Sequence, residues 1–84
     1  MATEHHLKID TVYYCRVLEG SKTFEIRKND RDYQVGDRLI MREWLPDKGQ
    51  YCDHSPPINA EIVYFTTYQQ QPGYCVLGIK VLGG

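Results

Sequence analysis

Apolar and polar residues alternate along several short stretches of the chain, and this period of two is typical of β-strands with one buried face. The longest such stretch covers residues 58–68. The residues on one of its faces are Ile58, Ala60, Ile62 and Tyr64, and those on the other are Asn59, Glu61, Val63 and Phe65. Shorter alternating stretches predict further strands over residues 7–9, 23–27, 38–45 and 74–81.

One stretch, residues 11–19, has helical spacing instead. Its apolar stripe consists of Tyr14, Val17 and Leu18. Asp10 precedes it and has a side-chain oxygen suited to the free amides of a first helical turn. Gly20 follows it and is the usual kind of residue at which a helix ends. A helix of fewer than three turns is not stable alone in water, so we expect it to pack on the sheet.

Five short strands with one short helix after the first predict an α+β fold that is mostly β. The expected arrangement is a small, mostly antiparallel barrel, which closes its sheet and removes exposed edges. The 84 residues have room for one domain, covering residues 1–84. A hydrophobic content of 42% with 25% charged residues is ordinary for a folded globular protein and argues against disorder.

The charge balance limits the possible partners. Ten basic and eleven acidic residues give a net charge of −1, so the chain lacks the overall basic field that drives tight non-specific binding to nucleic acid. Any binding of RNA must therefore depend on a local patch, and its affinity should vary little with salt concentration.

The cysteines and the hydropathy pattern indicate a cytoplasmic protein. The three cysteines are an odd number, and they are widely spaced at positions 15, 52 and 75, which predicts reduced thiols. No charged start is followed by a long apolar run, so we expect neither a signal peptide nor a membrane span. Cys52 and His54 are too close for the usual zinc spacing, and we expect no metal and no cofactor.

The most informative stretch follows the predicted helix. Gly20, Lys22, Glu25 and Arg27 stand in the order G-x-K-x-x-E-x-R. In an extended chain Glu25 and Arg27 fall on one face, and the two apolar residues between and before them fall on the other. Composition alone favours a solvated outer face for the charged side chains. The other interpretation is that they line a polar site.

These residues resemble the signature of the ASCH domain, a small β-barrel of the PUA-like superfamily implicated in RNA binding. Residues 5–9, 28–33, 35–37 and 73–78 resemble a compact, uncharacterised phage and bacterial branch of that superfamily. The resemblance implies a PUA-like barrel of about five strands with one short helix after the first strand. It also implies that the motif residues line a cleft.

The function implied by this resemblance is binding of RNA or a nucleotide-like ligand in that cleft. Lys22 and Arg27 would contact phosphate or base edges, and Glu25 would orient them. Trp44 or Tyr33 would stack on a base. His5, at the start of the first strand, would either border the cleft or form a hydrogen bond at the end of the barrel. The expected ligand-binding residues are Lys22, Glu25, Arg27, Tyr33, Trp44 and His5.

A second hypothesis is catalytic. A bacterial subgroup of the superfamily hydrolyses the acetyl amide of N4-acetylcytidine with a lysine, a threonine and a glutamate. Lys22 matches the lysine, but Glu25 stands at the position of the threonine, and Thr23 lies one alternation earlier. Glu61 is a loose candidate for the glutamate. The catalytic residues of such a small amidohydrolase would be Lys22, Glu25 and Thr23, although the pattern favours a binding module over an enzyme.

A third hypothesis is a phage or bacterial accessory protein that acts by binding another protein. Aromatic residues make up 12% of the chain, which is more than a barrel of this size needs for its core. The candidate contact residues are Tyr51, Tyr64 and Tyr68. The sequence does not determine the oligomeric state.

Overall fold

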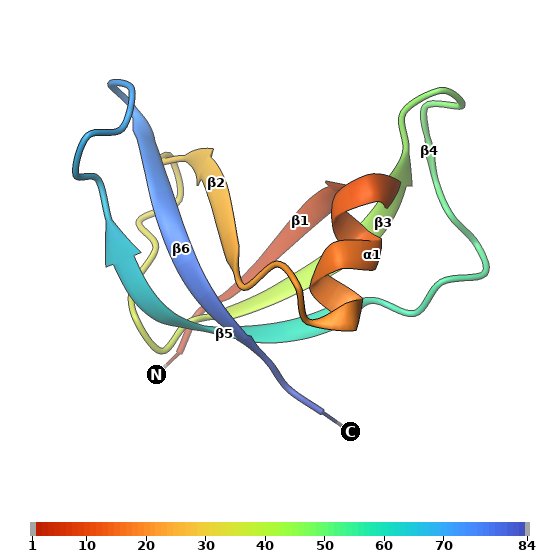
Figure 1. The fold of residues 1–84 in the computed structure, drawn as a ribbon, viewed down its shortest axis with the longest axis horizontal. Helices are drawn as coiled ribbons and strands as arrows, with labels where there is room; N and C mark the ends of the chain where they lie inside the picture. The colour runs from red at the N-terminus through yellow and green to blue at the C-terminus, as the bar shows by residue number, and fades with distance from the viewer. Residues whose placement is uncertain (1, 84) are drawn as a thin grey trace.

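The computed structural model of the protein describes residues 2–83, which form one curled sheet and one helix (Figure 1). The elements in chain order are β1 (Glu4–Asp10), α1 (Thr11–Glu19), β2 (Phe24–Lys28), β3 (Arg38–Leu45), β4 (Gln50–Tyr51), β5 (Ile58–Thr66) and β6 (Tyr74–Val81). The mostly β fold with one short helix after the first strand is therefore confirmed. The two-residue strand β4 was not predicted, because two residues are too few to show an alternation.

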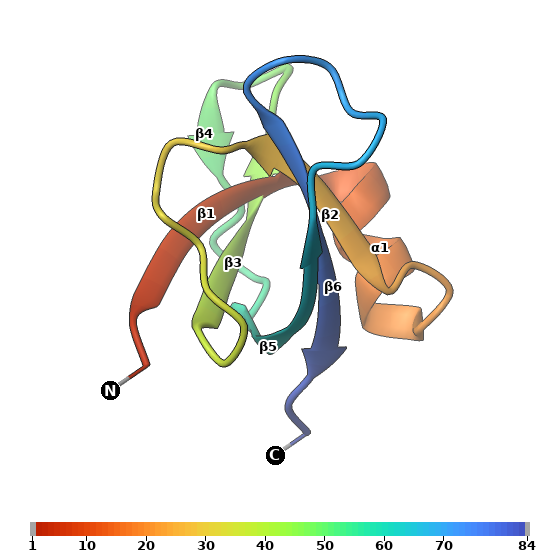
Figure 2. The same ribbon diagram turned by 90° about the vertical axis from the view of Figure 1, so that its left-hand side faces the viewer.

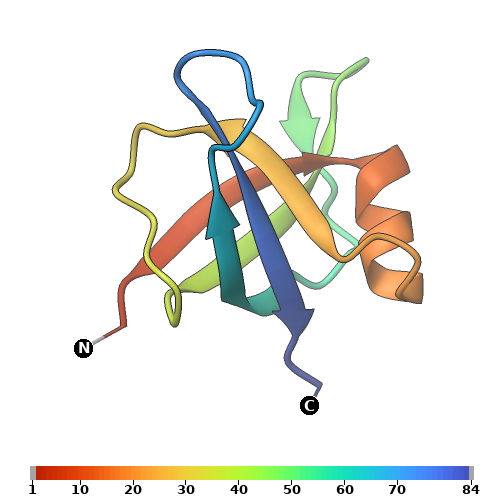
Figure 3. The same cartoon turned by 60° about the vertical axis from the view of Figure 1, so that its left-hand side comes forward.

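The strands lie in the order β1-β3-β5-β6-β2, and β4 pairs with β3. Strand β1 runs parallel to β3, whereas the other pairs are antiparallel. Figures 2 and 3 show that the sheet curls strongly, so that its two edge strands, β1 and β2, approach each other. Within residues 2–83 no backbone pairing joins them. The sheet is thus a strongly curled half-barrel of five strands rather than the closed sheet that the sequence predicted.

The core lies inside the curl and follows the alternation of the strands. Its largest fully buried side chains are Leu39, Met41, Ile62, Leu77, Val17 and Cys75. On β5 the predicted alternation is wrong in one respect. The register shifts between Ile62 and Tyr64, as at a β-bulge, and this reverses the faces of the residues that follow. Tyr64 is consequently 62% exposed, and Phe65 packs against the core in its place.

Helix α1 packs against β1 and β3 through Tyr14 and Val17, which are buried. The predicted stripe was too wide by one residue, since Leu18 is exposed. Gly20 ends the helix as predicted: its φ of 89° is left-handed, and its N–H donates to Val17 O at 3.1 Å. Asp10 occupies the N-cap position, but its side chain makes no capping hydrogen bond, so this part of the prediction was wrong.

Two buried carboxylates fasten loops to the half-barrel. Asp37 accepts hydrogen bonds from His5 Nε2 at 2.8 Å and from the backbone N–H groups of Thr3 and Gln34. Burial alone would raise the pKa of Asp37, but these hydrogen bonds outweigh it and hold the pKa below its ordinary value of 3.8. Glu43 is the second carboxylate.

Glu43 accepts hydrogen bonds from Ser55 Oγ and, at 2.6 Å, from Thr11 Oγ1, and so joins β3 to the start of α1 and to the loop before β5. The hydrogen bonds from Ser55 and Thr11 lower the pKa of Glu43 below its ordinary value of 4.5. Because the folded-state pKa is lowered, this contribution to stability is present above pH 4.5. It is lost as the pH falls through the folded-state pKa.

We therefore expect Ser55→Ala to lower the free energy of unfolding at pH 7 by about 1.5 to 3 kcal/mol, as for hydrogen bonds to charged groups. Urea denaturation at pH 7 and pH 3.5 measures the effect, and the deficit should narrow at the lower pH. Ser21→Ala is the matched control, because Ser21 Oγ donates to the exposed carboxylate of Glu19 and should contribute little. An equal deficit at both pH values would contradict this account.

Candidate functional site

The two edge strands of the half-barrel are joined by arginine side chains instead of a backbone ladder. Arg27 Nη2 donates to Lys8 O at 2.7 Å, and Arg31 Nη1 donates to His6 O at 2.8 Å. Lys8 and His6 both belong to β1, so Arg27 links β2 to β1, and Arg31 links the segment after β2 to β1. In Figure 3 the segment that follows β2 passes beside β1 on its way to β3. Two arginine side chains therefore make hydrogen bonds to β1 on the side where, within residues 2–83, its backbone is not paired with another strand.

A pocket of about 460 Å³ lies in this gap. It is lined by residues 8–10 of β1, Tyr13 of α1, Lys22 and residues 24–27 of β2. We call it the seam pocket. Its lining includes all three charged residues of the G-x-K-x-x-E-x-R motif, so the structure brings Lys22, Glu25 and Arg27 together at one hollow.

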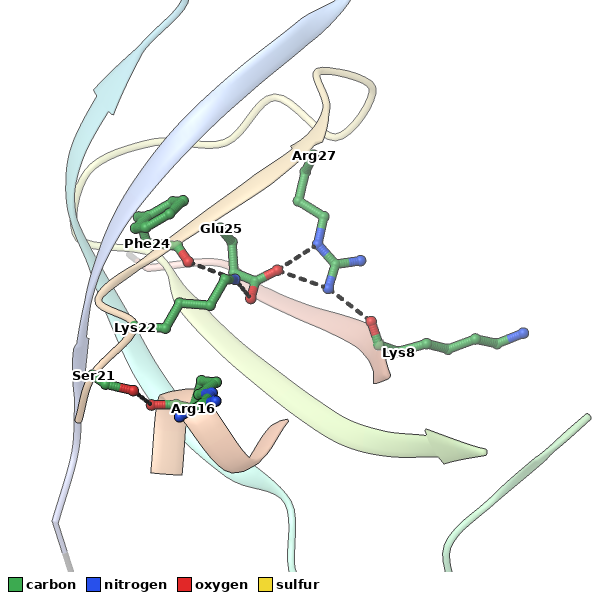
Figure 4. Close-up of polar contacts among 7 residues, drawn as sticks. All are labelled: Lys8, Arg16, Ser21, Lys22, Phe24, Glu25 and Arg27. Carbon is green, nitrogen blue, oxygen red and sulfur yellow. Dashed lines mark hydrogen bonds and ion pairs between the residues drawn. The ribbon is translucent and has the colours of Figure 1, made fainter. Parts of the chain in front are cut away.

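Glu25 is the centre of the seam pocket. It is only 5% exposed, and its two oxygens are shared between two cations (Figure 4). Lys22 Nζ donates to Oε1 at 2.6 Å, and Arg27 Nε donates to Oε2 at 3.2 Å. Burial of a carboxylate is costly unless it is paired and hydrogen-bonded, and these two partners satisfy that condition. The charged face of β2 thus points inward, contrary to the solvated face that composition favoured.

The apolar residues of β2 occupy the opposite face. Phe24 and Ile26 are 42% and 53% exposed, because the alternation that turns Glu25 and Arg27 inward must turn them outward. Lys22 also donates to Phe24 O at 2.8 Å. This bond lies on the free edge of β2, where Phe24 has no strand partner.

The charged cluster has hydrogen-bonding capacity left over. Of the three N–H bonds of the Lys22 ammonium, two are used within residues 2–83, by Glu25 and by Phe24 O. The Nη1 group of Arg27 has no partner in the same range. Two cations and one carboxylate leave the cluster with a net charge of +1. It therefore offers fixed donors and a modest positive potential to a ligand in the seam pocket.

Two aromatic rings flank the cation of Lys22. Its Nζ atom lies 5.2 Å from the ring centroid of Tyr13 and 5.1 Å from that of Phe24. Both residues line the seam pocket, and neither was named as a candidate from the sequence. The sequence held one signal for each residue. Tyr13 lies off the helical stripe that packs on the sheet, and Phe24 directly precedes Glu25 of the motif.

Four predicted residues lie elsewhere. Tyr33 is buried with its ring 4.7 Å from that of His5, which is itself tied to Asp37, so these two rings do not reach the seam pocket. Thr23 lines a different hollow, between the end of α1 and β6. Trp44 lies on the outer face of β3.

Trp44 nevertheless adjoins the seam pocket through Lys8. Lys8 lines the pocket, and its Nζ atom lies 3.9 Å from the ring centroid of Trp44. Trp44 meets Tyr51 edge to face at 5.0 Å, and Arg42 lies 3.8 Å from the centre of the Tyr51 ring. The outer face of β1, β3 and β4 thus carries a row of aromatic and cationic side chains.

The three tyrosines proposed for protein contact differ in their surroundings. Tyr64 and Tyr68 are exposed, whereas Tyr51 packs against Trp44. Among residues 2–83 no group of His, Cys, Asp and Glu side chains is placed to hold a metal ion. No helix in this part of the chain is long and apolar enough to cross a membrane.

Comparison with known proteins places the chain in a family. Residues 4–79 match a family model described as a domain of unknown function, DUF3850. The chain belongs to the DUF3850 family. The matched region runs from the start of β1 into β6, so the seam pocket of this DUF3850 domain lies entirely within it.

A relative of this DUF3850 domain occurs in a bacteriophage. The chain is 49% identical over 45 residues to an uncharacterized 12.9 kDa protein in the GpA 3′ region of Escherichia phage P2. The similar segment covers 54% of this chain and 41% of the phage protein. The chain thus matches less than half of that relative's length.

Proposed function

We propose that the protein binds RNA or a nucleotide-like ligand through the seam pocket, in the manner implied by its resemblance to ASCH domains. The observation that supports this most directly is the convergence of Lys22, Glu25 and Arg27 on one open pocket of about 460 Å³. That volume is within the range of about 300–1,000 Å³ usual for small-molecule sites. Tyr13 and Phe24 also line this pocket, and their ring centroids lie 5.2 and 5.1 Å from Lys22 Nζ.

The proposed chemistry assigns a task to each side chain. The remaining N–H groups of Arg27 and Lys22 bind acceptor atoms of a base edge or a phosphate. Glu25 holds both cations in place before the ligand arrives, which reduces the entropy lost on binding. Tyr13 and Phe24 supply ring faces, and stacking of an aromatic side chain on a base contributes about 1–3 kcal/mol.

The free edge of β2 adds backbone groups to this set. Thr23 O accepts from Ile79 N and Asn29 N donates to Gly73 O, so odd-numbered residues of β2 direct their backbone groups toward β6. The backbone N–H and C=O of Ile26 therefore point toward the seam pocket, which Ile26 lines. A donor and an acceptor at fixed spacing match the edge of a nucleobase.

The aromatic and cationic side chains next to Lys8 make the proposed site large enough for more than one nucleotide. Trp44 offers a partly exposed ring next to the pocket, on which a neighbouring base of a single strand would stack. Since the net charge of the chain is −1, affinity should be modest and should fall only slightly as salt is raised.

The geometry favours binding over amide hydrolysis. A hydroxyl nucleophile needs a base within hydrogen-bond reach. Lys22 lines the hollow of Thr23 as well as the seam pocket, but its ammonium donates to Glu25 and to Phe24 O rather than to Thr23. The amidohydrolase is therefore kept only as an outcome of the experiment below.

We expect Lys22→Ala to weaken binding of single-stranded RNA by about tenfold, because it removes one charge-assisted donor and loosens Glu25. Fluorescence anisotropy with labelled homopolymer octamers of each base measures the affinity, with circular dichroism to check folding. Lys80→Ala is the charge-matched control, since Lys80 lies on β6 outside the seam pocket.

The same protein should be incubated with N4-acetylcytidine and analysed for cytidine by chromatography. No cytidine is expected. Release of cytidine that Lys22→Ala abolishes would replace the binding proposal with the amidohydrolase. Equal loss of RNA affinity in Lys22→Ala and Lys80→Ala, or no RNA binding by the native protein, would also contradict the proposal.

A further inference from the structure

A second, smaller pocket shares Arg27 with the seam pocket. Its volume is about 200 Å³, and it is lined by Leu7, Arg27, Lys28, Asp30, Arg31 and Tyr33. We call it the basic pocket. Three cations and one carboxylate give its lining a net charge of +2, in a protein whose overall charge is −1. The lining of the basic pocket thus has a local excess of positive charge next to the seam pocket.

The two arginines of the basic pocket are held in position by β1. Arg27 is bound to Lys8 O and Arg31 to His6 O. These carbonyl groups are two residues apart on one strand, so they are separated by about 7 Å along it. Each guanidinium group has further N–H donors, and two such groups at this spacing suit the opposite sides of one tetrahedral oxyanion.

Tyr33 adds a hydrogen-bonding group to the lining of the basic pocket. The residue is only 4% exposed, yet its hydroxyl group makes no hydrogen bond to any of residues 2–83. In the same range no fully buried polar side-chain atom is without a partner. The hydroxyl is therefore not fully buried, and Tyr33 is one of the residues that line the basic pocket. Burial raises the pKa of Tyr33 although Arg31 and Arg27 act to lower it, so the phenol stays protonated and can donate a hydrogen bond to an anion.

We propose that the basic pocket is a phosphate subsite, in which Arg27, Arg31 and the Tyr33 hydroxyl bind the phosphate of the molecule whose base occupies the seam pocket. Lys28 adds charge at the rim. This inference rests on the proposed function and narrows its ligand to a nucleotide or a phosphodiester of RNA, in preference to a free nucleoside. Arg27 belongs to both pockets and is placed to contact both parts of that ligand.

The first test uses inorganic phosphate and needs no base in the seam pocket; Arg31, which lines only the basic pocket of the two, is its main reporter. In NMR titrations the side-chain Nε–H signals of Arg27 and Arg31 should shift with phosphate but not with chloride at equal ionic strength. Tyr33→Phe should weaken phosphate binding by about threefold, and Arg31→Ala by about tenfold. Identical shifts with both salts would overturn the subsite.

The second test compares each of the four nucleosides with its 5′- and 3′-monophosphates and with dinucleoside monophosphates, by calorimetry. The phosphorylated ligand should bind at least about tenfold more tightly than its nucleoside. Arg31→Ala should reduce that ratio to about one. Lys28→Ala, at an exposed residue, should reduce it by about twofold and serves as the second variant if Arg31→Ala does not fold.

The outcomes separate the two proposals. Equal affinity for nucleosides and nucleotides would overturn the phosphate subsite while the seam pocket remains supported. Binding of phosphate without binding of any nucleoside or nucleotide would support the subsite and contradict the proposed function. A preference for dinucleoside monophosphates would identify an internal phosphodiester as the ligand, and a preference for mononucleotides would identify a terminal phosphate.

Discussion

Replacing Glu25 with alanine is expected to lower the free energy of unfolding by about 3 kcal/mol, which is the lower end of the range for removing one member of a buried ion pair. The substitution leaves Lys22 and Arg27 without their shared counter-ion in a pocket where both are mostly buried. The lower end applies because the two cations keep some access to water.

Urea denaturation at pH 7 measures this loss. Glu19→Ala is the matched control, because Glu19 also pairs with an arginine, Arg16, but does so on the exposed surface of α1. Its removal should change stability little. If Glu25→Ala were no more destabilising than Glu19→Ala, Glu25 would not be the residue that organises the seam pocket.

Leu77→Ala is the second large expected effect. Leu77 is fully buried and pairs directly with Glu25 across β2 and β6. Its truncation leaves a cavity beneath the seam pocket, and such changes cost about 2 to 5 kcal/mol. In a domain of this size a loss of about 3 kcal/mol should lower the melting temperature by about 12 °C or more.

Thermal denaturation followed by circular dichroism gives the melting temperature. Val63→Ala is the control on β5, where the side chain is exposed and its loss should shift the melting temperature only slightly. A similar small shift for Leu77→Ala would show that the inner face of β6 is not the core described above.

The sequence predicted the elements well because their signals are local. The alternation along β1, β3 and β6 and the helical spacing of Tyr14 and Val17 each lie within a few residues. The glycine that ends α1 is equally local. The errors in the predicted elements were small. The clearest is the bulge after Ile62 on β5, where one extra residue reverses the faces of the residues that follow and no turn residue marks the position.

The candidate site was harder to predict because its geometry depends on distant partners. The inward direction of Glu25 requires Lys22 from the loop before β2, and that of Arg27 requires the carbonyl of Lys8 on another strand. Composition correctly states that charged residues are usually exposed, but it carries no information about such pairs.

The burial of Tyr33 was also not predicted. It follows a polar, turn-rich stretch that predicts a surface loop, yet its ring fills the space beside His5. A single aromatic residue in a polar loop can either cover the core or face solvent, and only the position of His5 on β1 decides between them. What places Tyr33 beside a basic pocket is the path of the chain from β2 to β3.

The most direct test of the central proposal is an NMR titration of the ¹⁵N-labelled protein with single-stranded RNA octamers. The account predicts that the largest amide shifts fall on the lining of the seam pocket, at Tyr13, Phe24 and Ile26. Shifts concentrated instead around Tyr64 on the outer face of β5, or no shifts with any octamer, would contradict it.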